Sequence, residues 1–102
     1  MEENLLSKDT PNTLKLADGK EYELPIMNLT TLANVEKTIG FGLAKLQSKI
    51  VDETASTLRL VIYALLKEKN SKLSLEEVGN LVTFETMKNV STVLSKILAI
   101  AG

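Results

Sequence analysis

The segment from Ala55 to Lys69 constrains the fold more than any other part of the sequence. Its large aliphatic residues fall around most of a helical circumference instead of along one stripe; they are Leu58, Leu60, Val61, Ile62, Leu65 and Leu66. A helix that is apolar on most sides is normally central and covered by other elements. We therefore expect the rest of the chain to pack around this segment.

The segment 13–24 has the pattern of a β-hairpin. Two stretches of alternating polar and apolar residues are separated by a turn at Asp18-Gly19. Pro25 then ends strand pairing, because proline has no amide hydrogen to donate. An isolated hairpin is only marginally stable, so this one must lie on helices or pair with further strands. The residues expected on its buried face are Leu14, Leu16, Tyr22 and Leu24.

Two helices are predicted between the hairpin and the central segment. Asn28 is a good N-cap and Gly40 a natural C-terminal stop for the first of them. Its apolar stripe consists of Leu29, Leu32, Val35 and Ile39. A short second helix is indicated by Leu43, Leu46 and Ile50.

Two more helices are predicted after the central segment. Ser74 and Glu77 have the spacing of a capping box, which predicts a short helix through Leu81. Thr83 is the next plausible cap, and the helix after it has the cleanest amphipathic pattern in the chain. Its stripe consists of Val90, Val93, Leu94, Ile97, Leu98 and Ala101.

These elements predict a mainly α (α+β) fold: a small bundle of four to five helices with an N-terminal β-hairpin packed on it. A chain of 102 residues fits one domain. We expect residues 1–12 to be a flexible lead-in and residues 13–102 to form the domain. Aromatic residues make up only 4% of the chain and there is no Trp, so the core must be aliphatic.

The residue types that support most catalysis are missing. The chain has no His and no Cys, which removes the commonest general base and the most reactive nucleophile. The acidic pairs Asp52-Glu53 and Glu76-Glu77 are expected at helix beginnings, where carboxylates favour the helix dipole. Gly40-Phe41-Gly42 follows a predicted helix and lacks the third glycine of a nucleotide loop. We therefore expect no enzyme activity, no metal site and no cofactor.

The charge balance and the length of the apolar runs limit the partners. Twelve basic and thirteen acidic residues give a net charge of -1, so nucleic acid is not expected as a main partner. The most apolar run, Leu60–Leu66, is far shorter than the ~20 residues that span a bilayer. The N-terminus resembles neither a secretory signal nor a transit peptide. The absence of Cys is compatible with a reducing cytoplasm.

Apolar side chains near the C-terminus are the remaining feature that could serve a function. Either the last stripe packs into the domain's own core, which we favour, or it offers an apolar face to a partner or to a second copy. Phe84 and Met87 have the same two interpretations, with a core position as the default. The candidate partner-binding residues are Phe84, Met87, Val90, Leu94, Ile97 and Ile100.

The order of the elements is informative in itself. A hairpin over Leu14–Leu24 is followed by a helix that holds Val35–Gly40, by the apolar run Leu58–Leu66 and by the segment Leu73–Gly79. In this order the segments resemble the tail assembly chaperones of long-tailed bacteriophages, and the resemblance covers most of residues 13–100. It carries over no catalytic or binding residue.

The resemblance implies a nonstructural phage factor in the host cytoplasm, encoded by a phage or a prophage. Such a factor shields the long tape-measure protein until tail-tube subunits polymerise around it. In that family a ribosomal frameshift often yields a longer product that contacts tail-tube subunits. Homo-oligomerisation remains open.

Two alternatives are a small head-to-tail joining protein of the virion and a small DNA-binding regulatory domain. A joining protein should appear in purified particles, whereas a chaperone should not. A DNA-binding domain should show a basic recognition helix, and the last helix has only Lys88 and Lys96.

Overall fold

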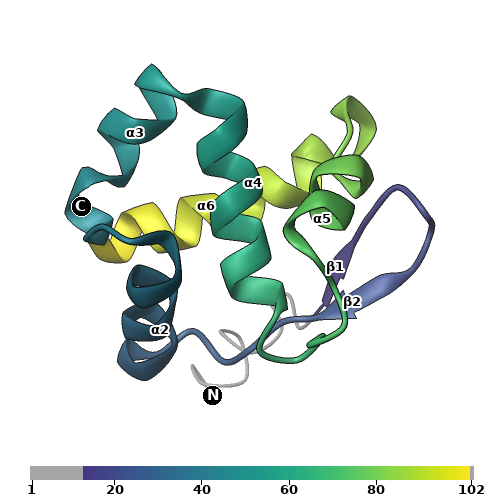
Figure 1. Cartoon of the computed structure of the whole chain (residues 1–102), viewed down its shortest axis with the longest axis horizontal. Helices are drawn as coiled ribbons and strands as arrows, with labels where there is room; N and C mark the ends of the chain where they lie inside the picture. Colours follow the sequence, from purple (N-terminus) through teal and green to yellow (C-terminus); the bar gives the residue numbers. More distant parts are fainter. Residues whose placement is uncertain (1–12, 102) are drawn as a thin grey trace, which may run out of the picture.

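The computed structural model describes residues 13–101, with side chains to residue 99, and it is mainly helical (Figure 1). The predicted fold class is confirmed: five α-helices and one antiparallel hairpin occur in the described residues. The expected lead-in, residues 1–12, lies outside them. In chain order the elements are β1 (Thr13–Lys15), β2 (Glu21–Glu23), α2 (Leu29–Ile39), the 3-10 turn η1 (Leu43–Lys45), α3 (Leu46–Asp52), α4 (Thr54–Leu66), α5 (Leu75–Leu81), the 3-10 turn η2 (Phe84–Thr86) and α6 (Met87–Ala101).

Helix α4 is the centre of the molecule, as its apolar circumference predicts. It packs against α2, α3 and α5, and α6 passes behind it in the view of Figure 1. Val61, Ile62 and Leu65 of α4 are fully buried. The core is a single cluster that draws residues from the hairpin and from every helix.

The hairpin forms over the predicted segment and turns at the predicted residues. Leu14 pairs with Tyr22 across the two strands, and Gly19 turns the chain with a φ of 82°, a conformation that favours glycine. Leu14, Leu16 and Leu24 are buried and Tyr22 is half-buried. The predicted buried face is therefore confirmed.

Three hydrogen bonds fasten the hairpin to the helices. The Ala17 amide donates to the Leu81 carbonyl at the end of α5 (2.9 Å). The Asn70 amide group donates to the Glu23 carbonyl (3.0 Å), and that of Asn89 donates to the Lys15 carbonyl (3.3 Å). The hairpin thus lies on the helices, as its marginal stability in isolation requires.

Helix α2 begins and ends at the predicted residues. The Asn28 side chain accepts from the Thr31 amide (2.9 Å), and Gly40 ends the helix with a φ of 88°. Leu29 is the exception, because it is 77% exposed although it was assigned to the apolar stripe. At 3.6 residues per turn, Leu29 lies about 100° round the helix from the centre of the buried face, which explains its exposure.

Helix α5 begins with the predicted capping box. The Ser74 hydroxyl accepts from the Glu77 amide (3.1 Å), and the Ser74 amide donates to the Glu77 carboxylate (2.9 Å). The carboxylate of Glu77 is therefore occupied in holding the start of the helix.

The cap before α6 is at the predicted place but uses a different hydroxyl. Thr86 accepts from the Thr83 amide (2.8 Å) and donates to the Thr83 carbonyl (3.0 Å). The hydroxyl of Thr83 itself is buried and has no hydrogen-bond partner among the described residues. Thr83 is therefore the N-cap residue, as predicted, and the side chain of Thr86 caps its backbone.

Candidate functional site

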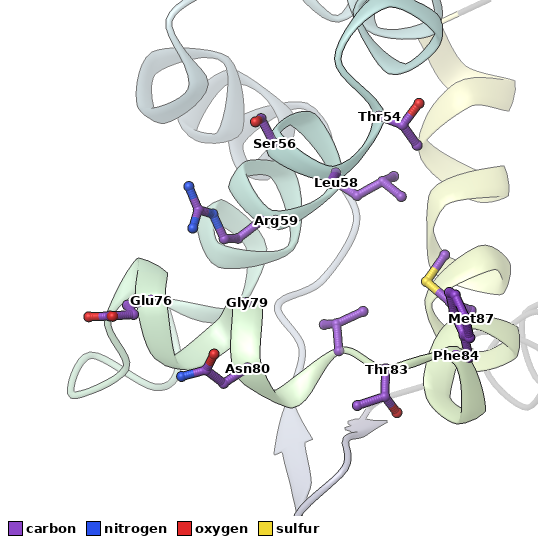
Figure 2. A pocket seen from close by; sticks show the side chains of 12 residues that line it. Thr54, Ser56, Leu58, Arg59, Glu76, Gly79, Asn80, Thr83, Phe84 and Met87 are labelled. Carbon is purple, nitrogen blue, oxygen red and sulfur yellow. The ribbon is translucent and has the colours of Figure 1, made fainter.

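A groove opens between α4, α5 and the beginning of α6. Its volume is about 840 Å³, and the connection 82–84 forms one end of it. In Figure 2, Leu58 extends from α4 across the hollow toward Met87 and Phe84. The groove forms because α5 packs on α4, whereas η2 carries the chain away from these two helices before α6 begins.

The groove has an apolar interior and a polar rim. Leu58, Val82 and Met87 supply the apolar interior, and all three are half-buried. Arg59 and Glu76 lie at the end away from Phe84 and point outward (Figure 2). Such an arrangement suits an apolar ligand surface with polar flanks.

Phe84 is the most exposed of the large hydrophobic residues in the described part of the chain. Its side chain is 97% exposed, on the η2 turn at the edge of the groove. The default interpretation of Phe84 as a core residue is therefore wrong. The physical reason is the η2 turn, which precedes α6 and places Phe84 outside the stripe that α6 buries.

Three other candidate partner-binding residues are not accessible. Val90, Leu94 and Ile97 are buried in the core cluster of the molecule itself. The favoured alternative for the last helix, packing into the domain's own core, describes these residues correctly, and their assignment as contact residues is corrected. The side chain of Ile100 lies outside the described residues. Of the six candidates, the groove brings together Phe84 and Met87.

Sequence reasoning missed the other half of the groove. Leu58 was assigned only to the central helix, and Val82 and Arg59 were not singled out. One local signal was available: Gly79 sits inside a helix, where glycine is unfavourable, and such a glycine often permits a close approach. In the structure the side chain of Arg59 lies against it.

The remaining exposed large aliphatic residues do not extend the groove. Ile26, Leu29 and Val51 are 78%, 77% and 75% exposed, and none of them lines it. Single exposed aliphatic residues are ordinary on protein surfaces. Because these residues are exposed and lie outside the groove, substitutions at them are suitable controls for substitutions in the groove.

The two acidic pairs lie at different positions relative to the helices. Asp52 is the last residue of α3 and Glu53 is the N-cap of α4, so Glu53 lies at a helix beginning as expected and Asp52 does not. Glu76 and Glu77 lie in the first turn of α5, as expected. Within residues 13–99, no group of three or more acidic residues is placed to hold a metal ion.

One tyrosine and one carboxylate interact strongly on the hairpin. The Tyr22 hydroxyl donates to the Asp18 carboxylate (2.5 Å). This bond lowers the pKa of Asp18 and raises the pKa of Tyr22 to about 12. The pair closes the hairpin turn and lies outside the groove.

None of the helices in the described part of the chain is long and apolar enough to cross a membrane. Comparisons with protein-family models, with curated proteins and with solved structures find no match to this chain.

Proposed function

We propose that this chain binds another protein by taking an amphipathic helix of that protein into the groove between α4, α5 and the start of α6. The observation that carries the proposal is Phe84, 97% exposed beside a groove with an apolar interior. Exposed aromatic residues beside a hydrophobic hollow often dominate binding energies. An apolar groove with a polar rim is the surface that helix-in-groove recognition uses.

The proposed partner is a phage tape-measure protein, and the chain is a tail assembly chaperone. The resemblance in the order of the elements supports this identity. Long amphipathic helices aggregate when their apolar stripes are bare, so a protein that covers them reversibly keeps them available for assembly. Each copy covers one short stretch with modest affinity. Many copies along one partner bind together by avidity, and the growing tail tube displaces them one at a time.

The groove residues divide the recognition between them. Leu58, Val82 and Met87 would receive apolar side chains of the helix, and Met87 can adapt to side chains of different shape. Arg59 at the rim would pair with an acidic residue beside the stripe. Adaptable apolar contacts fit a partner in which the stripe recurs while the individual residues vary.

The experiment uses the full chain and helical fragments of a phage tape-measure protein, with binding measured by isothermal titration calorimetry at low salt. Wild-type protein should bind several fragments. Phe84→Ser should weaken binding about thirtyfold or more, because an aromatic residue that dominates a contact is typically worth at least ~2 kcal/mol. Leu29→Ser is the matched control: Leu29 is also highly exposed but lies outside the groove, so its loss should change the affinity little.

Two results would count against the proposal. Failure of every fragment to bind the wild-type chain at low salt would remove the tape-measure protein as the partner. Equal weakening by Phe84→Ser and Leu29→Ser would remove the groove as the binding surface. With the full-length tape-measure protein, we expect more than one copy of the chain to be bound per partner.

A further inference from the structure

Helix α5 forms one wall of the groove, and few of its side chains hold it to the rest of the molecule. Of its seven residues only Val78 is fully buried, and the next residue, Gly79, adds no side chain to the contact with α4. Glycine also weakens the interior of a helix, because it loses more conformational freedom than alanine does. Parts of a protein with few buried apolar contacts open locally at a smaller free-energy cost than global unfolding. On these grounds α5 can leave α4 while the core of the molecule stays folded.

The contact between α4 and α5 is filled at Gly79 by a flexible side chain. A Cβ atom added there would stand 2.6 Å from Cδ of Arg59, so the Arg59 stem lies directly on the backbone of α5. Arg59 is exposed, and Figure 2 shows its guanidinium group pointing out of the groove. A long rotatable stem adjusts when two helices separate, whereas interlocked core side chains resist separation. This part of the contact therefore offers little resistance to movement of α5.

The two ends of α5 are held differently. At the C-terminal end the Leu81 carbonyl accepts from the Ala17 amide of the hairpin (2.9 Å). At the N-terminal end the capping box joins Ser74 and Glu77 only to one another, and turns over residues 67–72 connect this end to α4. Hinge movements use a few loop or terminal residues that absorb the change in backbone angles. The Leu81 end is thus suited to be a pivot, and the turns before α5 let the other end move.

We propose that α5 is a movable wall of the groove. It pivots at Leu81 and carries Glu76 and Gly79 away from Arg59, which widens the groove at the end away from Phe84. A partner helix then enters from that end. This entry rests on the proposed function, whereas the movement itself is a property of the chain alone.

Hydrogen exchange of the full chain tests the movement without a partner. A helix of seven residues is marginal in water by itself, so the amide hydrogen bonds of α5 open once it leaves α4. The amides of residues 79–81 should have protection factors at least about a hundredfold lower than those of Val61 and Ile62 in α4. Low concentrations of urea should speed exchange in α4 far more than in α5, because a local opening exposes little surface. Equal protection and equal urea dependence in the two helices would overturn the inference.

A reversible tether distinguishes separation from α4 from fraying within α5. The chain has no Cys, so a pair introduced across the contact can form only one intramolecular disulfide. A Cβ atom at Gly79 would stand 3.4 Å from Cγ of Arg59, close to the ~3 Å between a Cβ atom and the far sulfur of a disulfide. In the double variant Arg59→Cys, Gly79→Cys, oxidation should therefore join α5 to α4, and reduction should release it.

The oxidised and reduced forms of this double variant are matched controls for one another. Oxidation should raise the protection factors of residues 79–81 about tenfold or more, because the tether prevents separation of the two helices. Equal protection of these amides in both forms would show that α5 opens only by fraying, and the movable wall would be wrong.

The same two forms separate this inference from the proposed function. If the movement admits a partner helix, the oxidised form should bind labelled tape-measure fragments about tenfold or more slowly than the reduced form in stopped-flow measurements. Equal association rates would overturn the role of α5 in entry. Fragments that bind neither form would remove the proposed partner, and the exchange results would still decide whether α5 moves.

Discussion

The side chain of Arg59 on α4 lies against the α-carbon of Gly79 on α5. A Cβ atom added at Gly79 would stand 2.6 Å from Cδ and 3.4 Å from Cγ of Arg59, distances that require the arginine to move. Arginine commonly lays its aliphatic stem on a neighbouring surface while its charge stays in water. At the α4–α5 wall of the groove, the missing side chain of Gly79 therefore leaves the space that the Arg59 stem occupies.

The first prediction is that Gly79 and Arg59 are coupled in stability. Alanine is favoured over glycine inside a helix by ~1 kcal/mol, but in the wild-type chain Gly79→Ala displaces the Arg59 stem and should lose that gain. In an Arg59→Ala background the space is free, so Gly79→Ala should stabilise the protein. Urea unfolding of the two single variants, the double variant and the wild type should give a coupling of about 1 kcal/mol. Additive effects would show that the two residues do not constrain one another.

The second prediction concerns two threonines with opposite roles at the start of α6. Thr83→Val replaces a buried hydroxyl that has no partner in the described residues, so it should be neutral or stabilise the protein by up to ~1 kcal/mol. Thr86→Val removes the hydroxyl that accepts from the Thr83 amide and donates to its carbonyl, and should cost about 1 kcal/mol. Chemical unfolding of both variants measures the difference. Equal destabilisation would mean that the Thr83 hydroxyl has a partner.

The third prediction tests whether the apolar stripe of α6 belongs to the core. Ile97 is fully buried and Ile26 is 78% exposed, so the same substitution probes two environments. Ile97→Ala should lower the free energy of unfolding by ~2–5 kcal/mol, because it leaves a cavity. Ile26→Ala should change it by about 0.5 kcal/mol or less. A small effect of Ile97→Ala would show that this side chain lies at the surface, where a partner could contact it.

The fourth prediction is a pH dependence from the Asp18–Tyr22 hydrogen bond. The pKa of Tyr22 is raised from 10.0 to about 12, so the bond's contribution is complete below pH 10 and is lost as the pH rises toward 12. The pKa of Asp18 is lowered from 3.8, so on the acid side the contribution is present above that value and lost as the pH falls through the folded-state pKa. In a Tyr63→Phe variant, tyrosinate absorbance reports Tyr22 alone.

Asp18→Asn is the matched variant for this titration. It keeps the size of the side chain but removes the carboxylate that holds the Tyr22 proton, so the pKa of Tyr22 should fall toward 10.0. An unchanged titration in Asp18→Asn would show that the carboxylate does not set the pKa of Tyr22.

The elements that the sequence predicts well are those whose signals are local. The Ser74–Glu77 capping box and the Asn28 cap join atoms only three residues apart, so their geometry follows from the backbone of one helical turn. The hairpin is equally local, because its turn at Gly19 sets the pairing of the strands. Tertiary packing had little freedom to change these features.

The groove could not be predicted in the same way. Leu58 and Val82 are far apart in the sequence, and only the packing of α5 on α4 brings them to one hollow. The exposure of Phe84 depends on the η2 turn, which no periodic pattern in the sequence predicts. A stripe such as that of α6 identifies an apolar face but does not say whether the chain itself covers it. Here it does, because Val90 and Ile97 are buried in the core of the chain itself.

Helix α6 also limits the order in which parts of the protein can fold during synthesis. It is translated after every other described element, yet its inner face joins Leu14 of the hairpin in one core cluster. The hairpin is synthesised first, and its buried leucine side chains stay uncovered by α6 until α6 has left the ribosome. A nascent chain at that stage exposes apolar surface of the kind that promotes aggregation until α6 packs on it.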